Sequence, residues 1–447
     1  MSASPPPGTS RRGFLSRAAL ASGALVLPTG LFTLVGGSGC ASTSRRTDHY
    51  FIFYLMVGGW DLMFTTDPVN NKEGFYRPYD DDDIVMAGDL RLGPAMKALL
   101  PFQHKMGILK GIYVDALNHP QARFRMVTGK FKPPGNHVTA PSVQTLIAQA
   151  RGAAYQLPNL SSDQLRPATF RGDVSDLRLE PVRVSSIEQL QALTNIKGDV
   201  AKSRREIEET LRAKDALTAK RWQTSSSSDL AERFGAFADL ERDLSQSDYR
   251  KRVAASSTVV EEANRALGKT VDRTQRQVKL AVEAVHQDLA PVITVGTGEF
   301  DSHSRGEYAS HPAACMKGIA SVADIAHGLD AISTGDGRTL LDLTTIIVTS
   351  EFSRTPSRNE LGGKHHWPTN SMLFIGKGVR RNPSGQPNVF GVVDDNLVAQ
   401  AVNPHNGSTK KGVDLLDMSH GLATVLALGG IDPGPLLGQE PIVALLA

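Results

Sequence analysis

The sequence predicts an α/β fold in which a central parallel or mixed sheet is flanked by helices. Continuous apolar runs alternate along the chain with helical patterns, as expected when strands are buried on both faces. These runs end in Gly- or Ser-containing loops followed by acidic residues, where open α/β sheets place ligand sites. The composition is that of a globular protein, with 447 residues, 40% hydrophobic and 21% charged. Its two cysteines, Cys40 and Cys315, exclude a disulfide framework and a thiolate zinc cluster.

Four segments have the form of buried strands. The first is an apolar run that ends at Gly58-Gly59, and the full set is residues 50–57, 291–295, 344–348 and 372–375. Apolar spacing close to the helical period predicts helices between them, at residues 143–151, 311–332 and 418–428. This alternation places one α/β domain over residues 48–435.

A different composition interrupts that domain. No proline lies between Pro181 and Pro291, and the stretch is rich in Glu, Lys, Arg, Ala and Leu. Such a stretch predicts long, polar, amphipathic helices. We therefore expect a helical insertion over residues 186–288, packed beside the sheet.

Residues 1–39 have the pattern of an export signal. Arg11 and Arg12 precede a mild apolar run over residues 18–35, which Gly and Pro residues break. Paired arginines before a modest apolar segment predict a twin-arginine signal peptide, and the run is too short and too broken for a transmembrane helix. We expect a periplasmic or cell-envelope protein.

The segment Gly37-Ser38-Gly39-Cys40 resembles a lipoprotein cleavage box, in which the cysteine receives a lipid anchor. Gly37 stands where an aliphatic residue is usual, so ordinary cleavage nearby is the alternative. A chain starting at Cys40 loses three of its 49 basic residues and no acid, which leaves 46 basic and 46 acidic residues. This balance has no bulk signature of nucleic-acid binding.

Four short motifs carry most of the residues suited to chemistry. Asp61 follows the first predicted strand, Asp301 and His303 follow the second, Glu351 follows the third, and a His-His pair comes shortly after at residues 365–366. Carboxylates and imidazoles without thiolates suit hard or borderline divalent metals such as Mg, Mn, Ca or Zn. Side chains two apart in an extended segment point the same way, so Asp301 and His303 could face one ion.

Each motif alone has a simpler explanation. A lone His-His pair is more often a loop or core feature, and an aspartate after Gly-Gly is often a turn residue. The clustering of four such motifs nevertheless favours a metal site. Arg354 adds a fixed positive charge whose planar donors suit a phosphate or sulfate oxyanion.

The motifs together resemble a known family. The twin-arginine start, Gly-Gly-Trp-Asp, Phe-Asp-Ser-His, Ser-Glu-Phe-Ser-Arg-Thr-Pro and Gly-Gly-Lys-His-His-Trp-Pro resemble the exported bacterial family called domain of unknown function 1501. The resemblance covers roughly residues 48–150 and 286–435. That family looks like a branch of the alkaline phosphatase and sulfatase superfamily. The resemblance implies an alkaline phosphatase-like sheet between helices, with a binuclear metal site above the strand ends.

The resemblance also implies individual roles. The residues that match metal ligands are Asp61, Asp301, His303, Glu351 and His366. His365 stands where the family commonly has an acid, and Glu351-Phe352 replaces the superfamily's adjacent Asp-His, so one imidazole ligand is missing.

The nucleophile position is the largest departure. Arg123 and Thr128-Gly129 keep the spacing of the sulfatase nucleophile motif, but the nucleophile position falls on His119. His119 could be a different nucleophile, a metal ligand or a general acid, or ester hydrolysis has been lost.

These observations predict an exported, metal-dependent hydrolase of phosphate or sulfate esters. It would hold one or two divalent ions, and Arg123 and Arg354 would grip the oxyanion of a small anionic ester or an envelope polymer. The alternative is a non-catalytic exported relative that acts as a binding or assembly factor at the cell envelope. A third reading is a structural lipoprotein without a metal, in which the charged motifs are loop features.

Overall fold

The computed structural model describes residues 45–133, 140–162, 169–187, 189–190, 273–298, 300–409 and 414–447. The predicted signal over residues 1–39, Cys40 and most of the predicted insertion over residues 186–288 lie outside the described residues. Of that insertion, the structure describes a helix at Arg273–His286. Within the described ranges, no helix is both long and apolar enough to cross a membrane.

The centre of the molecule is an eight-stranded sheet with the order β12-β4-β11-β8-β1-β7-β5-β6. Its strands are β1 (Tyr50–Met56), β4 (Met106–Tyr113), β5 (Asn159–Ser162), β6 (Val182–Val184), β7 (Val292–Thr297), β8 (Thr344–Thr349), β11 (Thr369–Gly376) and β12 (Asn388–Phe390). β1 pairs in parallel with β7 and β8, whereas β11 is antiparallel to both β8 and β4. The predicted class, a mixed sheet flanked by helices, is confirmed.

Shorter elements decorate this sheet. Two-stranded pairs form between β2 (Val85–Ala87) and β3 (Leu90–Leu92), between β9 (Ser353–Arg354) and β10 (His366–Trp367), and between β13 (Val392–Val393) and β14 (Ala399–Gln400). The 3-10 helices are η1 (Leu62–Phe64), η2 (Asp81–Asp83), η3 (Pro94–Lys105), η4 (Leu177–Leu179), η5 (Leu340–Leu343) and η6 (Val443–Leu445).

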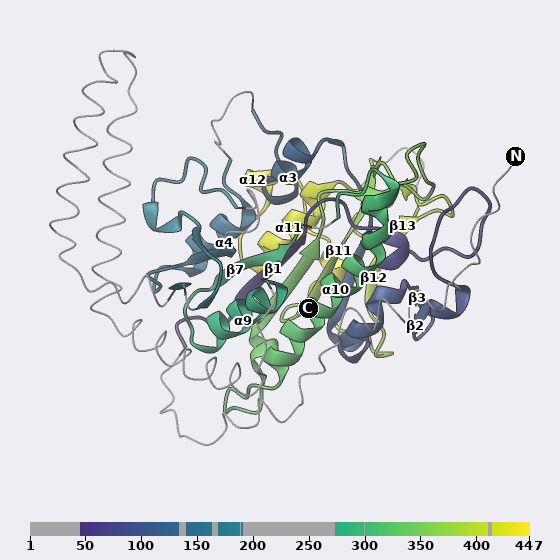
Figure 1. The fold of residues 1–447 in the computed structure, drawn as a ribbon. Helices are drawn as coiled ribbons and strands as arrows, with labels where there is room; N and C mark the ends of the chain where they lie inside the picture. Colours follow the sequence, from purple (N-terminus) through teal and green to yellow (C-terminus); the bar gives the residue numbers. More distant parts are fainter. Residues whose placement is uncertain are drawn as a thin grey trace, which may run out of the picture.

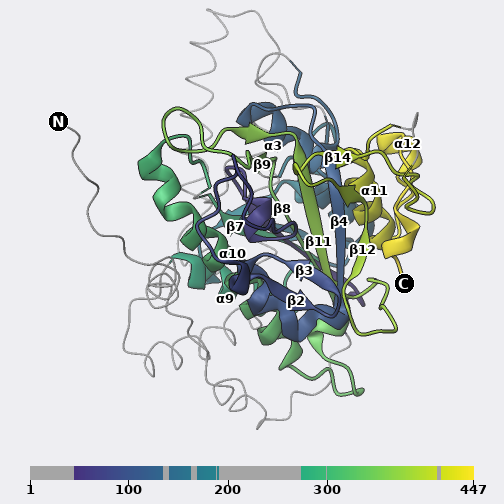
Figure 2. The ribbon, with the colours of Figure 1, turned by 90° about the vertical axis from the view of Figure 1, so that its right-hand side faces the viewer.

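The α-helices cover both faces of the sheet. They are α3 (His119–Thr128), α4 (Val143–Arg151), α9 (Arg273–His286), α10 (Arg305–Asp330), α11 (Met418–Leu428) and α12 (Gly434–Leu437). Figure 2 shows the sheet between α9 and α10 on one side and α11 and α12 on the other. α4 and α11 match their predicted ranges, while α10 starts six residues before the predicted 311 because Ser304 and Glu307 form a capping box there.

Side chains of β1 alternate between two hydrophobic cores. Ile52, Tyr54 and Met56 pack with residues of α9 and α10 in one core. Phe51 and Phe53 point the other way and pack with residues of α3, α4 and α11. Every residue of β1 is buried, which explains why this central strand reads as an unbroken apolar run.

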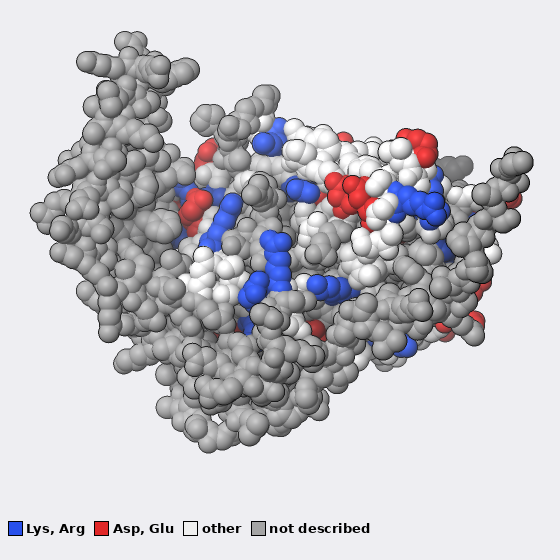
Figure 3. Space-filling model, in the orientation of Figure 1, with Lys and Arg blue, Asp and Glu red and all other residues white. Residues whose placement is uncertain are grey.

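The charged side chains on the face drawn in Figure 3 lie in small separate groups of both signs. The whole chain has a formal net charge of +3.

Most of the residues predicted to form the functional site lie at one edge of the sheet. β1, β4, β7 and β8 run in the same direction, so their carboxyl ends share this edge, and the antiparallel β11 begins there. Figure 1 shows β1, β7 and β11 among these central strands, and Figure 2 labels β4 and β8. The segments that follow or precede them carry Asp61 after β1, His119 after β4, Asp301 and His303 after β7, Glu351 after β8 and His366 before β11.

Candidate metal site

Four side chains from separate segments meet at this edge: His119, Asp301, His303 and His366. Each offers a ligand atom, and the four atoms all lie within 4.8 Å of one another. Nε2 of His119 is 3.3 Å from Oδ2 of Asp301, and Nε2 of His303 is 3.3 Å from Oδ1 of the same carboxylate. The resemblance implied a binuclear site, but the described parts of the chain contain this one group.

His119 is oriented by a buried carboxylate behind it. It is the first residue of α3, whose start is set by Asn118 as N-cap and by a proline in the first turn. Nδ1 of His119 lies 2.8 Å from Oε1 of Glu351, so this nitrogen carries the proton and donates it. Nε2 is then left with its lone pair, and it is buried without a hydrogen-bond partner. A carboxylate behind one ring nitrogen is the usual arrangement of a metal-ligating histidine.

Both carboxylate oxygens of Glu351 accept hydrogen bonds. Both carboxylate oxygens accept the backbone N–H of Gly58 at 2.9 Å, and Oε1 also accepts Nε of Arg123 at 3.1 Å. Burial opposes ionisation, but the hydrogen bond from His119 and the charge of Arg123 keep the pKa of Glu351 below its ordinary value. Glu351, predicted as a metal ligand, therefore lies one layer behind the group of four and faces it through His119.

His303 and His366 present two lone pairs to each other. Nδ1 of His366 is hydrogen-bonded to the carbonyl oxygen of Leu117, which only accepts, so Nε2 of His366 carries no proton in the neutral ring. Nε2 of His303 lies 3.4 Å from Nη1 of Arg354, which only donates. The two Nε2 atoms are nevertheless 2.8 Å apart. Two lone pairs at this distance repel unless a cation lies beside them.

A proton is poorly suited to that position. Burial and the charge of Arg354 lower the pKa of His303, and the same two causes lower the pKa of His366 to about 4. Both rings are therefore neutral at neutral pH, as metal ligation requires. The donor set of three imidazoles and one carboxylate fits a divalent metal ion.

Arg354 orients Asp301. The guanidinium is completely buried, and each of its five N–H groups faces an acceptor. Nε donates to the carbonyl of Gly59, and Nη1 donates to the carbonyl of Lys364 and points at Nε2 of His303. Nη2 donates to the carbonyl of Gly58 and, at 2.9 Å, to Oδ1 of Asp301. Burial opposes ionisation of Asp301, but the hydrogen bond from Arg354 keeps the pKa of this carboxyl group below its ordinary value.

Four of these N–H groups are held by backbone carbonyls and Asp301, and the fifth, toward His303, is released if that histidine binds an ion. Arg354 therefore positions Asp301, and its predicted grip on an oxyanion stays a prediction.

Glycine is required where Arg354 meets the first loop. Gly58 has φ +119°, and a Cβ there would lie 2.6 Å from the backbone nitrogen of Asp301. The Gly-Gly turn thus brings the ends of β1 and β7 into direct contact.

Asp61, also predicted as a ligand, is outside the group of four. Its carboxylate is completely buried, with Oδ2 2.7 Å from Nζ of Lys364 and 3.0 Å from the hydroxyl of Tyr308. The other oxygen, Oδ1, accepts the backbone N–H of Met63 and caps η1. Asp61 is therefore neutralised by a buried lysine. The sequence reasoning missed this pairing because 303 residues separate the two partners.

His365 points away from the group of four. Its side chain is 53% exposed and lies 3.6 Å from the carboxylate of Glu360. His366 pairs with Arg354 across β10 and β9, which places the two side by side. Neighbouring residues of an extended segment face opposite sides, and this separates the two adjacent histidines.

Arg123 lies at the site with its two terminal amino groups available as hydrogen-bond donors. Its Nε contacts the same Glu351 oxygen that holds His119, so Arg123 lies beside the group of four. Its side chain is 27% exposed, and among the described residues no hydrogen bond or ion pair engages its two terminal amino groups. The predicted oxyanion-binding role is chemically open to this residue.

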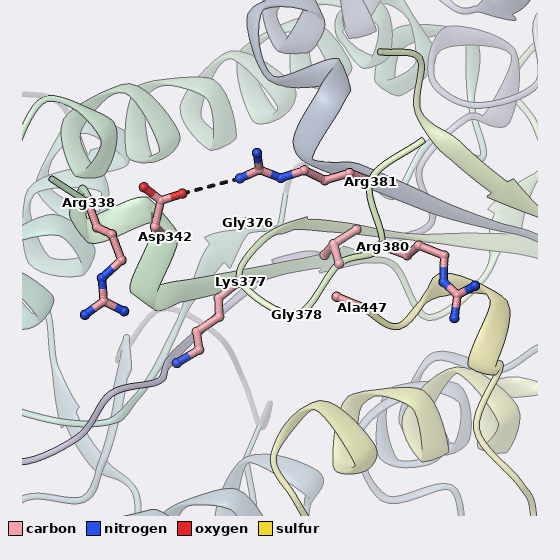
Figure 4. Close-up of a pocket in the computed structure, with 9 residues that line it drawn as sticks. Arg338, Asp342, Gly376, Lys377, Gly378, Arg380, Arg381 and Ala447 are labelled. Carbon is pink, nitrogen blue, oxygen red and sulfur yellow. Dashed lines mark ion pairs between the residues drawn. The ribbon is translucent and has the colours of Figure 1, made fainter. Parts of the chain in front are cut away.

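A hollow of about 790 Å³ lies at the opposite edge of the sheet, and Figure 4 shows the residues that line it. Its charged lining is already paired: Arg338 with Asp336, Lys377 with Asp48, and Arg381 with Asp342 at 3.7 Å. Arg380 donates to the backbone carbonyl of Leu446. None of the four residues of the candidate site lines this hollow, and the candidate site lies at the other edge of the sheet.

The sequence profile of the proteins of unknown function called DUF1501 matches residues 49–406. The chain belongs to the DUF1501 family. No curated protein matches it. Family membership therefore brings no activity with it.

Similar solved structures are distant from this DUF1501 protein. They include a protein in the alkaline phosphatase superfamily from Vibrio parahaemolyticus (11% identity, 98% of this chain and 80% of the other, TM-score 0.36). A lipoteichoic acid synthase from Listeria monocytogenes shows 9% identity over 94% and 82%, with TM-score 0.37. A sulfatase from Pseudoalteromonas sp. shows 13% identity over 95% and 72%, with TM-score 0.34. Likeness at this distance carries no activity over to the chain, whose function must be argued from its own site.

Proposed function

We propose that this DUF1501 protein is a metal-dependent hydrolase of phosphate or sulfate esters. The observation that carries the proposal is the buried, partnerless Nε2 of His119, which faces the Asp301 carboxylate beside two further unprotonated imidazole nitrogens. His119, Asp301, His303 and His366 would hold the ion. The three imidazoles favour Zn²⁺, and the carboxylate admits Mn²⁺, whereas Mg²⁺ and Ca²⁺ prefer sites made of oxygen ligands.

The chain's own residues divide the remaining work. A bound divalent ion polarises an ester oxygen and lowers the pKa of water. Glu351 keeps the proton on Nδ1 of His119, and Arg354 holds Asp301 in place. Arg123 offers its terminal amino groups to two oxygens of a tetrahedral phosphate or sulfate group.

Water is the attacking group in this proposal. Among the described residues, no hydrogen bond joins a serine, threonine or cysteine side chain to His119, Asp301, His303 or His366. Cys315 is buried inside α10, and burial raises the pKa of its thiol. With His119 engaged as a metal ligand and water as the attacking group, the proposed reaction is a single displacement at phosphorus or sulfur without a covalent enzyme intermediate.

The proposal includes a place of action. The twin-arginine pattern of residues 1–39 supports export, and a lipid on Cys40 would hold the protein at the membrane surface. Ordinary cleavage near that position would instead release it into the periplasm. A small anionic ester or an envelope polymer is the expected substrate.

A second candidate follows from the same absence of a side-chain nucleophile. In it, the protein keeps the metal but catalyses nothing, and serves as a binding or assembly factor at the envelope. Turnover separates the two candidates.

The test is hydrolysis of nitrophenyl phosphate and nitrophenyl sulfate, and of the diester, by the full chain loaded with Zn²⁺ or Mn²⁺. We expect turnover of at least one ester, lost in His366→Ala and kept in His365→Ala, which alters the adjacent histidine outside the group of four. Isotopically labelled water should place one labelled oxygen in the released anion in a single turnover. A metal-loaded protein that turns over none of these esters would support the assembly factor.

A further inference from the structure

The Asp61–Lys364 pair differs from every other ion pair in the described parts of the chain. Both side chains are 0% exposed, and Nζ lies 2.7 Å from Oδ2. The hydroxyl of Tyr308 donates to the same oxygen at 3.0 Å, and the backbone N–H of Met63 takes the other. The Lys364 ammonium also lies 5.1 Å from the centroid of the Tyr308 ring. Both Asp61 oxygens therefore have partners, and among the described residues Lys364 is the one basic side chain that forms an ion pair with it.

This pair is built into the same framework as the group of four. The backbone N–H of Lys364 donates to the carbonyl of Ser302, the residue between Asp301 and His303. The carbonyl of Lys364 accepts Nη1 of Arg354, which also orients Asp301. The backbone of Lys364 is thus tied by hydrogen bonds to the segment of Asp301 and His303 and to Arg354.

The charges of the region balance without any ion. Three carboxylates, of Asp61, Asp301 and Glu351, contact three basic side chains: Lys364, Arg354 and Arg123. One divalent ion adds two positive charges to this neutral set, and the excess favours an anionic ester. A second divalent ion would add two more without any unpaired carboxylate to receive them, which is costly in a buried region.

We propose that the Lys364 ammonium occupies the place of a second metal ion and limits this centre to one divalent ion. Lys364 is then a specificity-determining residue, because it sets the number of ions rather than contacting the first one. Removing its amine would leave Asp61 as a buried carboxylate that recruits a second cation. This inference rests on the proposed metal site.

The test is the stoichiometry of Mn²⁺ and Zn²⁺ binding to the metal-free full chain, measured by calorimetric titration and by elemental mass spectrometry after gel filtration. The wild-type chain should bind one equivalent. Two equivalents would overturn the role of Lys364 and leave the hydrolase proposal standing, whereas none would overturn both. Lys364→Ala should bind a second equivalent, and added propylammonium, which matches the atoms removed by the substitution, should compete with that second ion.

A paired variant covers the case in which Lys364→Ala does not fold. Asp61→Asn with Lys364→Met removes both charges while keeping similar shapes, so no buried charge is left unpaired. This double variant should keep one equivalent with the wild-type affinity. If the folded double variant loses that ion, the Asp61–Lys364 pair supports binding of the first ion and does not take the place of a second. That result would overturn the inference. A folded Lys364→Ala that binds one ion would also overturn it.

Discussion

Replacing Glu351 by glutamine tests whether the carboxylate behind His119 prepares it for a metal. The substitution keeps the shape and an accepting oxygen but removes the negative charge. Oε1 of Glu351 receives Nδ1 of His119 at 2.8 Å and Nε of Arg123 at 3.1 Å. A neutral acceptor makes His119 less basic and leaves the charge of Arg123 uncompensated beside the ion. Both effects weaken metal binding.

Loss of a residue that orients a metal ligand typically costs about 10–100-fold in affinity, or about 1.4–2.7 kcal/mol. Two effects act in the same direction here, so we expect the upper part of that range. The assay is competition with a chromophoric chelator at fixed pH. The matched control is Glu360→Gln, because Glu360 is 75% exposed and its carboxylate lies 3.6 Å from the outward-facing His365. Unchanged affinity in a folded Glu351→Gln protein would refute the argument about the His119 proton.

Three further perturbations have defined outcomes. Gly58→Ala should lower the free energy of unfolding by about 1–3 kcal/mol from backbone strain alone, and by more because the new Cβ would collide with the backbone of Asp301. Gly335→Ala is the control, because Gly335 has φ +85° but open space around it, so this variant should show the strain only. Denaturant titration measures the free energy of unfolding of both variants. Arg123→Ala should raise KM for an anionic ester roughly 10–100-fold at unchanged metal content; unchanged KM would exclude substrate contact. Burial lowers the pKa of His311 to about 3, below its ordinary value near 6.5, so the unfolded chain binds the proton more tightly and stability should fall as pH drops from about 6.5 to about 3. His311→Phe should flatten the dependence of the melting temperature on pH in that interval.

The fold could be predicted wherever local pattern and burial agree. The runs that became β1, β7, β8 and β11 are apolar throughout because neighbouring strands and both helical layers cover them. β4 was missed although it lies inside the sheet, since Gly107, Lys110 and Gly111 interrupt its apolar run. β5, β6 and β12 were missed because three or four residues carry too little pattern.

The candidate site was predicted in part. The sequence reasoning placed its residues at strand ends, and the topology brings those ends to one edge. It could not determine which carboxylates remain available to an ion. Asp61 is engaged by a lysine far along the chain, and Glu351 is engaged by His119 and Arg123. Such pairings depend on three-dimensional packing and leave no local pattern.

The most direct test of the central claim is the metal content of the folded full chain and of two variants at neighbouring positions. Elemental mass spectrometry would be applied to the wild type, His366→Ala and His365→Ala. The account predicts Zn or Mn in the wild type and in His365→Ala, and its loss from His366→Ala, whose Nε2 faces His303. Metal retained equally in both variants, or absent from the wild type even after addition of these ions, would contradict the account.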